Sequence, residues 1–145
     1  MAGHVASAET DIDASTADVW TALTSPEAIA QYMWGAQVET DWEPGSPIVW
    51  RGEYEGTPYE DKGKIVEILP GQRLVVTHYS PLRGKEDVPE SYHTLTYMLG
   101  ASDGCTHLSL SQDGNGSEEE AEHSRGMWEQ MLAGVKRVAE GNAAG

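Results

Sequence analysis

Two histidines stand at the ends of two expected strands, where they could do chemistry together. His78 closes a strand whose other inward positions are apolar, and His93 opens the next strand on the same face. We expect the polar loop at 83–90 to join these strands as a hairpin, which would bring both imidazoles together with Tyr97, Tyr54 or Tyr59 nearby. An imidazole near neutral pH serves as acid or base, anchors a ligand or binds a metal. The pair is therefore a candidate for each role, or consists of two histidines satisfied by backbone or water.

No third metal ligand accompanies this pair. His4, His107 and His123 lie on other expected elements, and none has the spacing of a known zinc motif. Glu119 and His123 stand four residues apart on an expected helix, a spacing that suits an exposed surface pair as well as a metal. We therefore expect no metal site, no cofactor and no assigned catalytic residue.

Acidic residues also occur close together in the first half of the chain. They alternate with strand residues or fall in turns, so we interpret them as a solvated outer face rather than paired catalytic carboxylates. These acids are Asp41, Glu43, Glu53, Glu55, Glu60 and Asp61. The sequence contains no glycine-rich phosphate loop, nucleophile elbow or Cys-His pairing.

The element that must cover these side chains is a long amphipathic helix expected over 115–141. Ser117 precedes Glu120 by three residues, the spacing of a capping box at a helix start. Apolar residues then recur at steps of three and four, which predicts one buried stripe. The stripe comprises Met127, Trp128, Met131, Leu132, Val135 and Val138. Met and Trp fill irregular space, so this helix is expected to close either a core or a pocket.

The remaining elements are mostly strands. A first strand over 5–13 is followed by two short helices, which begin after Ser15 and after Ser25. Period-two alternation and turn residues then predict about six antiparallel strands before the last helix. One of them carries Val38, Thr40 and Trp42 on one face, and another covers 65–69. The pattern predicts an α+β fold in one domain over 1–145, with a curved antiparallel sheet packed on the long C-terminal helix.

Composition limits the partners of this domain. Asp and Glu number 24 against 9 Lys and Arg, a formal charge of −15, which repels nucleic acid and anionic membranes. No apolar run is long enough for membrane insertion, so none is expected. Cys105 is the single cysteine, and the first residues show neither a basic leader nor an apolar secretion signal. We therefore expect a cytoplasmic protein, either a monomer or a homodimer.

Several segments, taken in order, resemble the SRPBCC (START-like) superfamily, and within it the group homologous to the activator of the heat-shock-protein-90 ATPase. The similar segments are 12–27, Trp34, 63–70 with Leu74, 106–110, and Met127-Trp128 with Leu132, Lys136 and Glu140. The resemblance implies a helix-grip fold, with two short helices after strand one and a cavity between the long helix and the sheet. His78 and Met127 depart from the commonest family pattern at the expected cavity wall, so the resemblance specifies no ligand.

These inferences together favour binding of a small hydrophobic or aromatic molecule in that cavity, without defined catalysis. The residues expected to contact the ligand are Trp34, Trp50, His78, His93, Tyr97, Met127, Trp128 and Met131. Two alternatives stay open: a polyketide cyclase or aromatase-like enzyme with a cavity histidine as general base, and an acidic protein-interaction module resembling a co-chaperone.

Overall fold

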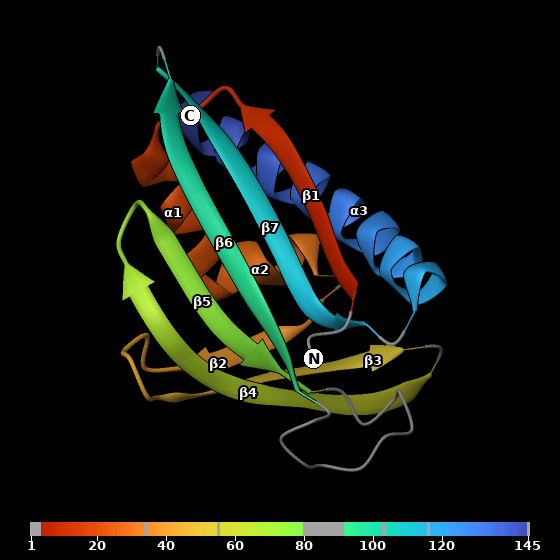
Figure 1. The fold of residues 1–145 in the computed structure, drawn as a ribbon. Helices are drawn as coiled ribbons and strands as arrows, with labels where there is room; N and C mark the ends of the chain where they lie inside the picture. Colours follow the sequence, from red (N-terminus) through yellow and green to blue (C-terminus); the bar gives the residue numbers. More distant parts are fainter. Residues whose placement is uncertain are drawn as a thin grey trace.

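A seven-stranded antiparallel sheet forms the framework of the chain in the computed structural model (Figure 1). The structure describes residues 4–33, 35–54, 56–79, 92–102, 104–115 and 117–144. The strands are β1 (His4–Ile12), β2 (Gln37–Thr40), β3 (Pro47–Tyr54), β4 (Thr57–Leu69), β5 (Arg73–His78), β6 (His93–Ser102) and β7 (Cys105–Asn115). The helices are α1 (Thr16–Thr24), α2 (Pro26–Tyr32) and α3 (Glu118–Ala144). The expected strand, two helices, six strands and long helix are confirmed in that order.

The strands lie in the order β1-β7-β6-β5-β4-β3-β2, and the three helices lie on one face of the sheet (Figure 1). The core between the layers contains the inward residues of alternate strand positions, as the period-two pattern predicted. Its largest fully buried side chains include Ile12, Ile48, Ile65, Leu108, Leu110, Met131, Leu132 and Val135. The predicted α+β helix-grip architecture is therefore confirmed.

Each helix begins at the serine that the sequence indicated. The hydroxyl oxygens of Ser15, Ser25 and Ser117 accept the backbone N–H three residues later. Such caps satisfy backbone donors that have no partner within the helix. Among the described helices, none is both long enough and apolar enough to cross a membrane.

Strand β4 is much longer than the strand predicted over 65–69, because its first half pairs with β3 and its second half with β5. The partner changes between Lys64, which pairs with β3, and Ile65, which pairs with β5, close to Gly63. A Cβ atom there would lie 1.8 Å from the carbonyl oxygen of Thr77, so only glycine permits this approach. Next to this close approach, Lys62 and Tyr79 exchange two backbone hydrogen bonds of 3.0 and 2.7 Å.

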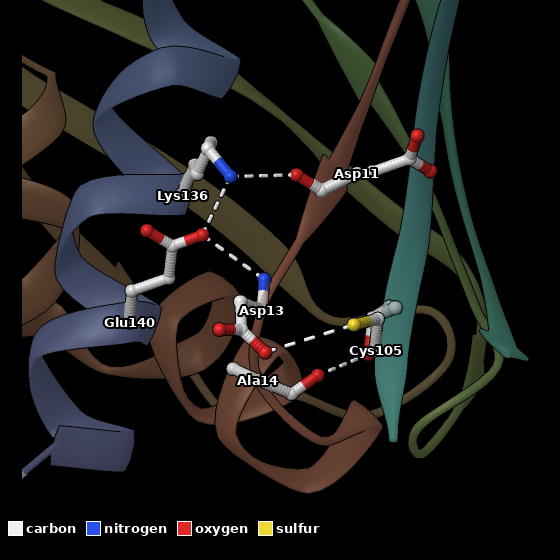
Figure 2. Close-up of polar contacts among 7 residues, drawn as sticks. Asp11, Asp13, Ala14, Cys105, Lys136 and Glu140 are labelled. Carbon is white, nitrogen blue, oxygen red and sulfur yellow. Dashed lines mark hydrogen bonds and ion pairs between the residues drawn. The ribbon is translucent and has the colours of Figure 1, made fainter. Parts of the chain in front are cut away.

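The C-terminal half of α3 is bonded to the end of β1 (Figure 2). The Lys136 ammonium donates a hydrogen bond of 2.8 Å to the backbone carbonyl of Asp11 and forms an ion pair with Glu140. The Glu140 carboxylate in turn accepts a 3.0 Å hydrogen bond from the backbone N–H of Asp13. This network fixes the helix along the sheet edge.

Gly134 of α3 provides a second close approach, which leads to a paired stability prediction. A Cβ atom at 134 would lie 2.5 Å from the Tyr32 Cβ, whereas one at Gly126 meets nothing within 4 Å. We expect Gly134→Ala to lower the free energy of unfolding by about 1–3 kcal/mol through overpacking. Gly126→Ala should raise it by about 0.5–1 kcal/mol, because alanine favours helix. Chemical denaturation of both variants tests this, and two changes of the same sign would contradict it.

Glu140 generates a pH prediction. The hydrogen bond from Lys136, and then that from the Asp13 backbone, lower the pKa of Glu140 below its ordinary value of 4.5. A folded-state pKa below the unfolded one gives stability that is present above pH 4.5 and is lost as the pH falls through the folded pKa. Glu140→Gln should therefore lower Tm at pH 7, with a difference that shrinks in acid. Glu129→Gln, which changes an exposed acid of the same helix, should show no comparable pH-dependent loss.

Candidate functional site

A small cavity lies on the inner face of the sheet, beneath α1 and α2. Its described lining consists of Leu23, Ile29, Tyr32, Met33, Trp42, Ile48, Trp50, Leu74, Val76 and Tyr97. These residues come from both short helices, the turn after β2, and strands β3, β5 and β6. The space open to the centre of a water molecule is about 20 Å³, which holds about one water.

The cavity lining is apolar and uncharged. Burial raises the pKa of Tyr97 well above its ordinary value, and it raises the pKa of Tyr32 in the same direction. The Tyr32 hydroxyl donates a 3.0 Å hydrogen bond to the backbone carbonyl of Ala22. Both phenols are therefore neutral at physiological pH, and they serve this cavity as hydrogen-bonding and aromatic surface rather than as phenolates.

Trp42 reaches the cavity from a rare backbone conformation. The sequence placed it in a strand with Val38, but β2 ends at Thr40 and Trp42 has a positive φ of 57°. A bulky residue in the left-handed region is uncommon and stores backbone strain. The turn thereby directs the indole of Trp42 into the cavity lining rather than along the strand.

His78 forms a polar pair with Asp61 beside this cavity. The two side chains are 13% and 14% exposed, and His78 Nε2 lies 2.9 Å from Asp61 Oδ2. The His78 ring also meets the ring of Trp50 edge to face, with centroids 5.1 Å apart at 67°. Trp50 is the register partner of Asp61 and also lines the cavity, so it connects the polar pair with the apolar hollow.

His93 is the direct cross-strand partner of His78, as the expected antiparallel pairing of β5 and β6 required. His93 is 3% exposed, and its Nδ1 lies 2.7 Å from the backbone carbonyl of Asp113 on β7. The Nε2 of His78 is thus bonded to β4, whereas the Nδ1 of His93 is bonded to β7. Gly114 makes room for His93, because a Cβ there would lie 3.0 Å from Nδ1.

The helix residues expected to contact a ligand pack elsewhere. Trp128 is buried and donates a 3.0 Å hydrogen bond from Nε1 to Oε1 of Gln112 on β7. Met131 is 1% exposed in the core, and Met127 is 38% exposed. None of the described cavity-lining residues comes from α3. The expected Trp34 lies outside the described residues.

The structure thus brings Trp50, Tyr97 and His78 to one region, and it adds residues that the sequence analysis missed. Tyr32 and Trp42 join the cavity lining. Asp61 is enclosed beside His78, so its interpretation as part of a solvated outer face was wrong. Its position two residues before Gly63, in alternation with the buried strand residues that follow, was the available signal. Among the residues described, no three His, Cys, Asp or Glu side chains cluster to hold a metal.

Comparisons with known proteins agree with this architecture. Residues 13–140 match the family model described as Activator of Hsp90 ATPase homolog 1-like protein. The solution structure of ChR145 from Cytophaga hutchinsonii is similar, with 41% identity and a TM-score of 0.85 over 100% of this chain and 99% of that one. A search of curated proteins found no match.

Two more distant structures share the fold. The Aha1 dimer from Colwellia psychrerythraea has 16% identity and a TM-score of 0.73, covering 94% of this chain and 96% of that chain. DynU16, a protein in the dynemicin biosynthetic locus, has 16% identity and a TM-score of 0.77, covering 96% of this chain and 48% of that chain. The family match spans most of the sequence, so the chain belongs to the Activator of Hsp90 ATPase homolog 1-like family of the SRPBCC superfamily.

Proposed function

We propose that this protein binds a small hydrophobic or aromatic molecule on the inner face of its sheet, without a defined reaction. The observation that carries the proposal is the aromatic lining: Tyr32, Trp42, Trp50 and Tyr97 surround one hollow. Ligand sites are typically apolar and aromatic, with a few polar groups that fix orientation. Aromatic faces also favour offset or edge contacts with a flat ligand. A flat, largely apolar molecule is therefore the class of ligand that this lining suits.

Binding requires the lining to move. The free space of about 20 Å³ is far below the roughly 300–1,000 Å³ of ordinary ligand pockets. Met33 and Trp42 are half-buried and pack at the margin of the core, so their displacement uncovers less apolar surface than displacement of a core residue. Met33 is also unbranched and adapts readily to new neighbours. The ligand is expected to replace these side chains in the hollow rather than to enter an open pocket.

Native mass spectrometry of the protein purified from its own host tests the proposal. We expect a reproducible extra mass of small-molecule size that disappears on denaturation. Trp50→Ala should weaken retention of that molecule by at least about tenfold, because loss of an aromatic anchor commonly costs about 2 kcal/mol or more. Met98→Ala, on the opposite face of the sheet and 48% exposed, is the matched control and should retain it. A bare protein mass would count against binding.

A second candidate function is a cyclase or aromatase-like reaction with His78 as general base. The observation favouring it is the 2.9 Å contact with Asp61, which orients the imidazole as carboxylates do in catalytic pairs. DynU16, which shares the fold, lies in a biosynthetic locus, and that likeness alone assigns no activity here. His93 suits the role of base less well, because its Nδ1 is bonded to the neutral Asp113 carbonyl rather than to a carboxylate that would stabilise an imidazolium.

Turnover of a candidate polyketide by the wild-type protein and by the His78→Ala and His93→Ala variants tests this second function. His78→Ala should lower kcat by about 100-fold or more, the contribution typical of a general base. His93→Ala should affect kcat much less, provided that a thermal melt shows a folded variant. Unchanged turnover in His78→Ala would remove the enzymatic candidate.

A further inference from the structure

The Asp61 and His78 pair is built by the backbone rather than by flexible surface side chains. The close approach at Gly63 and the bridge between Lys62 and Tyr79 hold β4 against β5 at this level. Asp61 and His78 project from these two strands and meet through Nε2 and Oδ2 at 2.9 Å. Their relative position is therefore fixed by strand register, as a pre-organised binding group requires.

Each member of the pair has a second polar side-chain atom that takes no part in the hydrogen bond between them. Within the described part of the chain, Asp61 Oδ1 and His78 Nδ1 are buried and have no hydrogen-bond partner. Buried polar atoms in folded proteins are nearly always paired, so an unsatisfied one calls for a specific explanation. Because two such atoms belong to adjoining side chains, a bound molecule could form hydrogen bonds with this pair.

The hydrogen bond between the side chains defines the chemistry of the remaining atoms. An ionised Asp61 carboxylate only accepts, so His78 Nε2 must carry the hydrogen that joins them. In the neutral imidazole this leaves Nδ1 as an acceptor, and Oδ1 of Asp61 is a second one. The neutral form also avoids a buried N–H at Nδ1 without an acceptor, which is rarer in proteins than an under-satisfied acceptor. Both remaining atoms then call for a donor.

The donor is expected to come from the cavity side. Val76 lines the hollow, and His78 is the next residue on the same face of β5. Trp50 lines the same hollow and contacts the His78 ring edge to face. A ligand that lies against the indole of Trp50 would reach the pair with its polar end while its apolar body stays among the aromatic lining.

We propose that Asp61 and His78 form an acceptor pair that selects an aromatic ligand carrying a hydroxyl or amino donor. The proposal rests on the ligand-binding function above and specifies the polar group of that ligand. The pair acts as an anchor: each acceptor can take one O–H or N–H hydrogen of the ligand, and Asp61 fixes the tautomer of His78. An ether or an unsubstituted ring leaves both atoms unsatisfied and binds less well.

Calorimetric titration with two matched probes tests this selectivity. 2-Naphthol and 2-methoxynaphthalene share an apolar body, and only the first can donate. We expect 2-naphthol to bind about tenfold more tightly, the factor typical of one hydrogen bond to a charged or polarised acceptor. Equal affinity would overturn the acceptor pair and leave the binding function intact. Failure of both probes to bind would remove the binding function and this proposal with it.

Substitutions separate the pair from general packing. Asp61→Asn replaces an acceptor with an amide that can donate, so the preference for 2-naphthol should disappear while both probes still bind. Glu60→Gln is the matched control, because Glu60 lies next to Asp61, is exposed and pairs with Arg51. Loss of the preference in Glu60→Gln as well would contradict a specific role for Asp61.

A measurement on the unliganded wild-type protein keeps the proposal testable if Asp61→Asn does not fold. Nitrogen chemical shifts of the His78 ring distinguish a protonated from an unprotonated nitrogen. We expect a proton on Nε2 and none on Nδ1 at neutral pH. A proton on Nδ1 would overturn the acceptor pair, whatever the probes show.

Discussion

The arrangement of the site depends on one backbone contact, the approach of β4 to β5 at Gly63. The Thr77 carbonyl occupies the space in which any side chain at 63 would begin, since a Cβ would lie 1.8 Å from it. This approach lets one strand pair with β3 through its first half and with β5 through its second half. The sheet thereby curves around its inner face, and the same curve places Asp61 beside His78. The absence of a side chain at Gly63 thus allows the strand contact that brings Asp61 and His78 together.

The long helix closes this curved sheet by packing and polar contacts. Trp128 is hydrogen-bonded to Gln112, and Lys136 and Glu140 bond to the backbone at the end of β1. Gly134 allows the helix to approach Tyr32, one of the residues that line the cavity. These contacts hold α3 against β1, β7 and α2, and its Met131 is part of the core. The helix therefore supports the lining residues without lining the cavity itself.

Local rules predicted the elements well, because each depends on neighbours in sequence. The serines at 15, 25 and 117 marked the helix starts, and alternation marked most strands. The same rules predicted the buried stripe of α3 but not its role, since a Trp that packs in a core and one that contacts a ligand look alike in sequence. Trp128 is such a case, with its indole N–H bonded to a buried Gln112. Asp61 and Trp42 were misplaced because a close strand approach and a positive φ arise from tertiary structure, which a sequence pattern does not contain.

The small volume of the cavity and the fixed geometry of the polar pair have opposite consequences for binding. A hollow of about 20 Å³ can take up a ligand only if side chains that now line it move away. Part of the favourable contact with the ligand then replaces contacts that the protein already makes without it. The unsatisfied atoms of Asp61 and His78 have no such contact to lose within the described structure. A donor that reaches them adds hydrogen bonds without breaking any within the protein. Selectivity for a ligand is therefore expected to come from the polar pair, while the aromatic lining sets how large a molecule can be accommodated.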